Sequence, residues 1–205
     1  KNQAPQRHIS LAEAIQKFGD QIAAIIVEPL HGAGGIIPVP SAALQEIQRV
    51  CTENGFLLIV DEVATGFYRA GSTFHYQDLA LRPDMLVLGK GMSAGYLPLS
   101  AVLIHPRIGE MYSREQRKAP FMHGHTFSGN PLACAAAIGN LNVLSESETV
   151  RGILRLQDLL RDELERLFRH EHGTHVRQRG LIAGIELFGD RLPNDRCADI
   201  ALDVC

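Results

Sequence analysis

The chain has 205 residues, of which 45% are hydrophobic and 21% are charged, a composition typical of a globular protein with a substantial core. Its formal net charge of -3 argues against a nucleic-acid or anionic-membrane partner and favours small molecules. The four cysteines are scattered without a CxxC pair, which argues against a zinc site or a disulfide scaffold. No apolar run approaches the roughly 20 residues of a membrane span, and no signal peptide is visible, so we expect a cytoplasmic protein.

The first elements in chain order predict a parallel sheet. Ser10 and Glu13 form a capping-box pattern that predicts a helix over 10–18, with Gly19 as its stop. The run SAALQEIQRVCTENG predicts a helix that starts at Ser41 and ends at Gly55. Continuous apolar, β-branched runs predict buried strands over 22–29, 56–63, 85–90 and 100–106. Because a helix connects the first two strands, we expect a parallel pair there.

The second half of the chain is more helical. Apolar spacing predicts helices over 131–144 and 150–168, followed by strand and turn material over 175–188. We therefore expect an α/β fold in which a mostly parallel sheet is flanked by helices. Residues 1–145 would form part of this large domain, and residues 146–205 would begin a smaller α+β domain.

Polar residues follow the predicted strands at the edge where parallel α/β sheets bind ligands. Lys90 stands between two glycines at the end of one strand, and Asp61 ends the run FLLIV. A buried ammonium or carboxylate is costly without a partner, so each could simply form a structural ion pair, or Asp61 could cap the following turn. Together they match the needs of pyridoxal phosphate, an amine for its aldehyde and an anion for its ring nitrogen.

Four ordered segments resemble the class III pyridoxal-phosphate-dependent aminotransferases of fold type I. They are VEPLHGAGG, LLIVDEVATGFYRAGSTF, RPDMLVLGKGMSAGYLPLSAVL and FMHGHTFSGNPLACAAA, which span roughly residues 20–145. The resemblance implies that Lys90 holds the cofactor as a Schiff base and then moves a proton between substrate and cofactor. It implies that Asp61 pairs with the ring nitrogen and that Val63, two positions on, packs against the ring.

The same resemblance implies roles for four further residues. Thr126 would bind the cofactor phosphate of a neighbouring subunit, which requires a homodimer with shared active sites, and His125 would line the phosphate site. Glu28 would support the cofactor region, and Gly124 would leave room for substrate. A solvated Glu28, a core valine at 63 and a simple turn at HGHT remain alternatives. His123 and His125 lack a third ligand at useful spacing, so we expect no metal.

The chain departs from the family in several places. Ala33 stands where some ω-amino-acid enzymes carry a glutamate, which argues against an ornithine or γ-aminobutyrate type of substrate. Tyr68 stands where glycine is common, so we expect a differently shaped substrate-entry loop. The chain lacks an initial Met and ends in a helix-like run, so we expect a fragment. We expect the phosphate-binding turn, the ring-stacking aromatic residue and the carboxylate-binding arginine of the family to lie outside it.

The favoured function is an aminotransferase that moves an amino group from an amine or amino acid, including ω-amines, to a keto acid or aldehyde. Alternatives are the adenosylmethionine-8-amino-7-oxononanoate aminotransferase of biotin synthesis, an aminomutase or decarboxylase on the same scaffold, and a truncated non-catalytic binding module. A nicotinamide-dependent oxidoreductase is disfavoured because HGAGG is not GxGxxG at a helix start.

Overall fold

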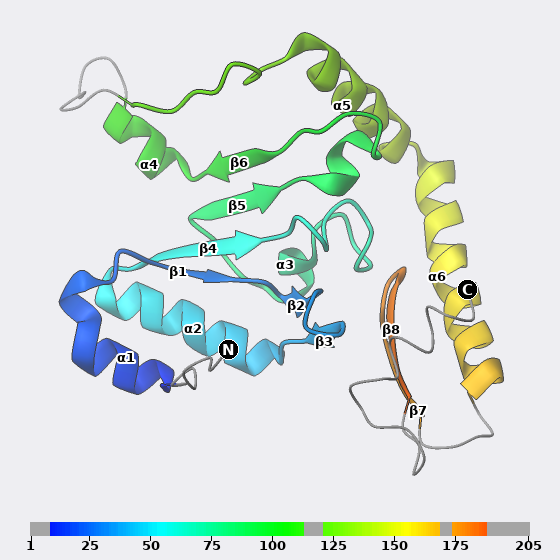
Figure 1. The fold of residues 1–205 in the computed structure, drawn as a ribbon, viewed down its shortest axis with the longest axis horizontal. Helices are drawn as coiled ribbons and strands as arrows, with labels where there is room; N and C mark the ends of the chain where they lie inside the picture. Colours follow the sequence, from blue (N-terminus) through cyan, green and yellow to red (C-terminus); the bar gives the residue numbers. More distant parts are fainter. Residues whose placement is uncertain (1–8, 113–120, 169–173, 188–205) are drawn as a thin grey trace, which may run out of the picture.

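A four-stranded sheet with the order β1–β4–β5–β6 forms the centre of the molecule (Figure 1). The computed structural model describes residues 9–112, 121–168 and 174–187. The strands are β1 (Ala24–Val27), β4 (Leu57–Asp61), β5 (Met85–Leu88) and β6 (Ala101–Ile104). The first three are parallel, and β6 runs antiparallel to β5. The predicted mostly parallel sheet is therefore confirmed.

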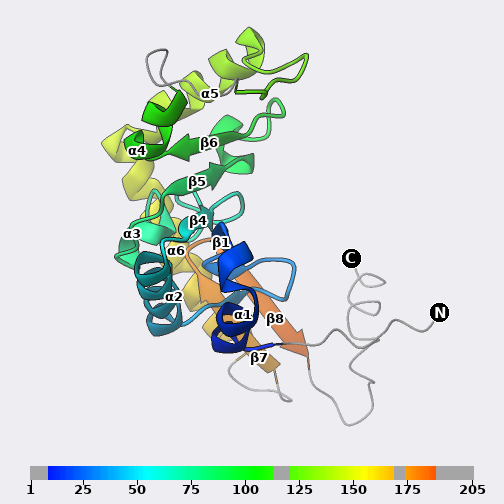
Figure 2. The ribbon, with the colours of Figure 1, turned by 90° about the vertical axis from the view of Figure 1, so that its left-hand side faces the viewer.

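The main core lies on one face of this sheet. Leu58 and Val60 of β4 and Leu86 of β5 are buried, and the residues between them are only partly covered. The helices α2 (Ser41–Asn54) and α5 (Pro131–Leu144) add apolar side chains to the same cluster. In the turned view, α2 lies with the short helix α3 on one side of the strands (Figure 2).

The opposite face of the sheet is open in the described part of the chain. Strand alternation places Ile26 of β1 and Val102 of β6 on this face. Both are well exposed, at 61% and 54% of their surface. The sheet therefore presents an apolar surface on the side away from α2.

The helix ends follow the sequence with two differences. In α1 (Leu11–Phe18), Ser10 and Glu13 form the predicted capping box. Gly19 ends this helix but stays in the right-handed region and opens the 3-10 turn η1 (Gly19–Gln21). In α2, Ser41 is the first helical residue and forms no side-chain cap, because Pro40 occupies the capping position.

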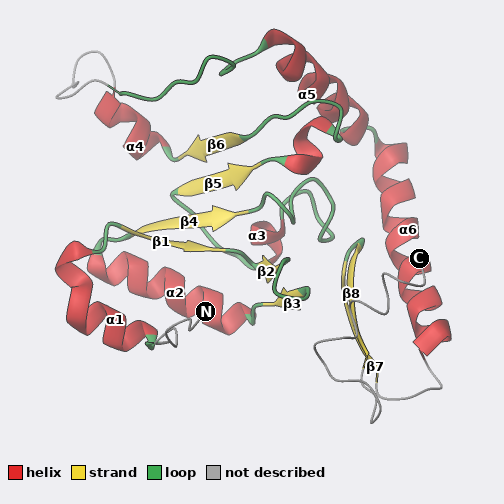
Figure 3. Ribbon diagram, viewed as in Figure 1, coloured by secondary structure: helices red, strands yellow, loops and turns green. Residues whose placement is uncertain are grey.

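Several short elements connect the longer ones, and Figure 3 shows how much of the remaining chain is loop. They are the antiparallel pair β2 (Leu30–His31) and β3 (Ile37–Pro38), the helices α3 (His75–Asp78) and α4 (Pro106–Gly109), and the 3-10 turns η2 (Lys90–Ser93) and η3 (Glu110–Tyr112). None of these was predicted, because elements this short carry no periodic signal.

The helix α6 (Ser147–Phe168) leads to a hairpin of β7 (Thr174–Arg179) and β8 (Ile182–Leu187). The helix begins at Ser147 rather than at the predicted residue 150, and residue 188 lies outside the described residues. The hairpin contacts the loop after β2, where Arg177 donates through two nitrogens to the Gly35 carbonyl at 2.8 and 3.1 Å. Of the helices within the described ranges, none is long and apolar enough to cross a membrane.

Candidate active site

Three of the predicted site residues lie at one edge of the sheet, where the parallel strands end. Glu28 follows β1, Asp61 is the last residue of β4, and Lys90 comes two positions after β5. Asp61 lies opposite Val87 of β5, so it is next to the strand that leads into Lys90. The sheet topology therefore brings the carboxylate and the amine to neighbouring strand ends.

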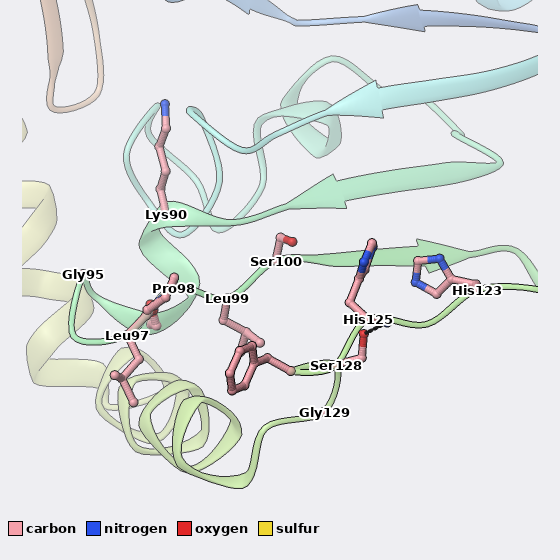
Figure 4. Close-up of a pocket in the computed structure, with 12 residues that line it drawn as sticks. Lys90, Gly95, Leu97, Pro98, Leu99, Ser100, His123, His125, Ser128 and Gly129 are labelled. Atoms are coloured by element: carbon pink, nitrogen blue, oxygen red, sulfur yellow. Dashed lines mark hydrogen bonds between the residues drawn. The ribbon is translucent and has the colours of Figure 1, made fainter.

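Lys90 opens the turn η2 in an unusual backbone conformation. Its φ is 40°, in the left-handed region, although it carries a full side chain. It lines a cavity of about 880 Å³ together with Ser100, His125 and Ser128. Figure 4 shows the lysine extended away from Leu97 and Leu99, on the far side of the cavity from the histidines. Its ammonium has no hydrogen-bond or ion-pair partner among the described residues, which leaves the amine available for chemistry.

Asp61 uses one carboxylate oxygen to hold the turn that follows it. Its Oδ1 accepts a hydrogen bond from the Val63 N–H at 2.9 Å, which is the turn-capping alternative considered for this residue. Within the described ranges, Oδ2 accepts no hydrogen bond. Asp61 is half-buried and lines a second cavity of about 460 Å³ with Glu28 and His31. In this chain Lys90 and Asp61 therefore line different cavities.

Val63 connects the two strand ends. The strand stops at Asp61, so the expectation that Val63 continues an extended strand is wrong, and the residue lies in a turn. Its side chain lies 3.4 Å from the position where a Cβ on Gly89 would stand. Val63 thus contacts the backbone next to Lys90 while its own N–H is bonded to Asp61.

Of the two glycines beside Lys90, Gly91 is the one whose surroundings leave little room for a side chain. Gly89 has an extended backbone that any residue can adopt. A Cβ on Gly91 would stand 3.1 Å from the Cβ of Phe67, which is too close. Gly91 therefore leaves room for the loop after β4.

The loop before α5 holds the remaining predicted residues. The His125 N–H donates to Ser128 Oγ at 3.0 Å, and the residue lines the same cavity as Lys90 (Figure 4). Gly124 and Thr126 are exposed, and nothing lies within 4 Å of a Cβ position on Gly124. Neither residue lines the cavity that contains Lys90. The structure thus groups Lys90 with His125 and leaves Thr126 facing outward.

The loop after β4, in which Tyr68 stands where glycine is common, has uncommon backbone dihedral angles. Phe67 and Tyr68 both have positive φ, at 59° and 66°. Their N–H groups donate to the carbonyls of Thr73 and Ser72, which closes the loop on itself. Tyrosine therefore adopts the conformation that glycine takes most readily, at a cost of about 1–2 kcal/mol.

Two residues that support the site were not recognised in the sequence. Glu62 is fully buried and accepts hydrogen bonds from Thr65 Oγ1 and from the N–H groups of His75 and Tyr76. Asn140 of α5 donates to the carbonyls of Gly91 and Met92. The adjacent charged pair Asp61-Glu62 was a usable signal for Glu62, because neighbouring residues leaving a strand point to opposite faces. Nothing in the local pattern pointed to Asn140.

Within the described ranges, no three His, Cys, Asp or Glu side chains are grouped so that they could hold a metal ion. His123 and His125 contact each other edge to face, with ring centres 5.9 Å apart. The two histidines therefore lie close together as an aromatic pair.

Comparisons with known proteins match the chain to aminotransferases. The family model described as Aminotransferase class-III matches residues 1–204. Adenosylmethionine-8-amino-7-oxononanoate aminotransferase of Geobacter sulfurreducens is 37% identical over 183 residues, which cover 88% of this chain and 40% of that protein. Gamma aminobutyrate transaminase 3 of Solanum lycopersicum is 34% identical, over 91% of this chain and 36% of its own length.

A solved structure shows the same fold. The (S)-enantioselective omega-transaminase from Thermomicrobium roseum superimposes with a TM-score of 0.80 at 36% identity, over 90% of this chain and 42% of that chain. This chain thus spans about two fifths of the length of the proteins it matches. With a family match over nearly its whole length, the chain belongs to the class III aminotransferase family.

Proposed function

We propose that this chain supplies the lysine-bearing part of a pyridoxal-phosphate-dependent aminotransferase. The enzyme moves an amino group from an amine or amino-acid donor, including ω-amines, to a keto acid or aldehyde. The observation that carries the proposal is the position of Lys90 and Asp61 at neighbouring strand ends. Among the described residues, the Lys90 ammonium and the Asp61 Oδ2 have no hydrogen-bond partner. Relatives named for three different reactions share 34–37% identity with this chain, so assay must identify the donor.

The residues present fit the cofactor. When bound, pyridoxal phosphate supplies an aldehyde that condenses with an amine, with loss of water, and a protonated ring that withdraws electrons from the substrate carbon. Lys90 supplies an amine that has no partner among the described residues, at the wall of a cavity large enough for a small molecule. Asp61 supplies a carboxylate oxygen that can hold a proton on a ring nitrogen, and Val63 supplies an apolar side chain beside the backbone that leads into Lys90.

Within this function, each of the predicted site residues has a role. Lys90 binds the cofactor and then carries a proton at its Nζ atom. His125 lines the phosphate site, and Thr126 binds the cofactor phosphate of a neighbouring subunit. Gly124 leaves space for substrate, and Glu28 supports the cofactor region beside Asp61, with which it shares a cavity.

The test is covalent trapping in the full-length protein. Borohydride reduction with pyridoxal phosphate, followed by peptide mapping, should leave the reduced cofactor on the peptide that contains Lys90. Lys90→Ala should abolish transamination, and Asp61→Ala should weaken cofactor retention and lower the rate, because the ring nitrogen loses its proton. Retained turnover in Lys90→Ala would refute the proposal. Stoichiometric consumption of a keto acid without release of carbon dioxide distinguishes transamination from the aminomutase and decarboxylase alternatives.

We further propose that two copies form a homodimer with shared active sites. Exposed apolar residues lie in the loop that carries Thr126 and at the start of α5: Phe121, Met122, Phe127 and Leu132. Thr126 lies outside the cavity of its own Lys90. A second copy packed on this surface would cover the apolar side chains and receive Thr126 at its cofactor phosphate.

Mixed dimers test this arrangement. The Lys90→Ala subunit, inactive alone, and the Thr126→Ala subunit, weakly active alone, should regain activity when mixed, because one of the two sites in the mixed dimer then contains neither change. A mixture of Lys90→Ala with Asp61→Ala is the control, since both of its sites remain defective. Absence of recovery in the first mixture, at a measured dimer mass, would place Thr126 in the site of its own subunit.

A further inference from the structure

The turn that carries Lys90 is held in a conformation that it would not adopt alone. Lys90 has a φ of 40° and Ala94, at the other end of η2, has a φ of 52°. Residues with side chains occupy this region rarely, and they persist there only when surrounding contacts enforce it. The contacts on η2 therefore determine where the lysine side chain starts.

One of these contacts comes from a side chain far away in the sequence. The Asn140 Nδ2 donates to the Gly91 carbonyl at 2.8 Å and to the Met92 carbonyl at 3.1 Å, across 49 and 48 residues. Asn140 is half-buried on α5, and both of its amide hydrogens are used on this turn. Among the described residues, the Gly91 carbonyl otherwise receives only a long bond of 3.4 Å from the Ala94 N–H.

The loop after β4 holds the same turn from another direction. Gly91 packs against Phe67, whose N–H donates to the Thr73 carbonyl at 2.7 Å. The start of this loop is fixed by the buried carboxylate of Glu62. The turn η2 is thus held by an amide on α5 and by an aromatic side chain after β4.

We propose that Asn140 is a positioning residue for Lys90. The inference rests on the proposed function, because it concerns the direction in which the lysine presents its amine. Rotation of the peptide units at Gly91 and Met92 would turn the Lys90 Cα–Cβ bond, and the long side chain would enlarge the displacement at Nζ. Displacement of a reacting group by about 1 Å can cost about a hundredfold in rate.

The chain offers a matched pair of substitutions on one helix. Asn140→Asp keeps the shape of the side chain but replaces two donors by an acceptor that faces two carbonyls. Asn142→Asp makes the same change two positions along α5, at an exposed residue whose side chain has no hydrogen bond among the described residues. Both variants add one negative charge to the same helix.

The first measurement uses the cofactor-free full-length protein. The rate of acylation of Lys90 by a small reagent, followed by mass spectrometry, should change in Asn140→Asp and stay unchanged in Asn142→Asp. The rate of pyridoxal phosphate capture and kcat should each fall by about tenfold or more in Asn140→Asp. The melting temperature of each variant shows how much of a change reflects folding alone.

A change below about threefold in capture rate and kcat, or a loss no larger than the fall in folded fraction, would overturn the proposal. Asn140→Gln, which keeps the donors, should recover part of the rate. If Asn140→Asp does not fold, Gly91→Ala disturbs the same turn through Phe67 and should give the same loss of capture rate. Unimpaired capture in Gly91→Ala would then count against the proposal. The Lys90→Ala result is independent of these outcomes, so a failure of this inference leaves the proposed function standing.

Discussion

His75 is a buried histidine beside two charged side chains. Its Nδ1 lies 3.3 Å from Asp78 Oδ2 and 3.4 Å from an Arg179 nitrogen. Burial of the ring and the guanidinium of Arg179 lower the pKa of His75 from its ordinary value, against the opposing effect of Asp78. The folded protein therefore favours the neutral imidazole.

Acidification should destabilise the fold through His75. Because its folded pKa is depressed, the unfolded chain takes up the proton first as the pH falls below about 6.5, and stability falls until the folded pKa is reached. The melting temperature of the full-length protein should drop less steeply over this range in His75→Gln than in wild type. His31→Gln, at an exposed histidine, is the control. Equal slopes in wild type and His75→Gln would contradict the assignment.

At the residue scale, sequence reasoning located the two charged residues at strand ends because each interrupts an apolar run. It did not locate Glu62 as a buried acceptor, although the opposite directions of two neighbouring residues at a strand end were a usable signal for it. The role of Asn140 could not be predicted from the sequence, because its hydrogen-bond partners lie 48 and 49 residues away and depend on how α5 packs against η2. The roles of Thr126 and Gly124 in the site remain predictions.

At the element scale, the four strands of the central sheet were predicted because each is a continuous apolar run that ends at a polar residue or turn. The end of β4 was placed too late, since the Asp61 carboxylate bonds the Val63 N–H and starts a turn. The two-residue ladder of β2 and β3 was missed. Such short pairs depend on loop contacts, such as that between Arg177 and Gly35, which no local pattern encodes.

Two glycines on helices should respond in opposite ways to the same substitution. Gly55 ends α2 with a φ of 72°, and nothing lies within 4 Å of its Cβ position. Gly55→Ala should therefore destabilise the protein by about 1 kcal/mol through backbone conformation alone. Gly152 lies inside α6 with similarly open surroundings, so Gly152→Ala should stabilise by about 0.5–1 kcal/mol.

Thermal unfolding of the two variants beside wild type measures this difference. A lower melting temperature for Gly55→Ala and a higher one for Gly152→Ala is the expected result. Shifts of the same sign would show that side-chain contacts, rather than φ, decide the effect at one of these positions.

At the scale of the whole molecule, the β7–β8 hairpin packs tightly against two loops that extend from the sheet. A Cβ on Gly184 would stand 2.9 Å from the Gly35 carbonyl oxygen, and a Cβ on Gly180 would stand 2.4 Å from the Gly71 nitrogen. Gln157 of α6 adds a bond to the Gly71 carbonyl at 3.1 Å. The C-terminal part of the described chain is therefore joined to the loops that follow β2 and β4. The division into domains near residue 145 stays a prediction.

Gly184→Ala should loosen this docking. The added methyl group would press on the Gly35 carbonyl and on Ile36, so the hairpin must move away from the loop. Hydrogen exchange should become faster at residues 32–36 and 182–186, with little change in β4 and β5. Gly139→Ala on α5, where nothing lies within 4 Å of the Cβ position and φ is not positive, is a control for the substitution itself. Unchanged exchange at residues 32–36 would show that the hairpin tolerates the extra atom.

The topology also indicates which strands pair first during folding. The antiparallel β5 and β6 are joined by residues 89–100, whereas β1 and β4 are joined by residues 28–56. Because the entropy lost on closing a loop grows with its length, the shorter connection is easier to close by up to roughly 1 kcal/mol. The segment that holds Lys90 is consequently drawn together early, before the longer crossovers have assembled the rest of the sheet.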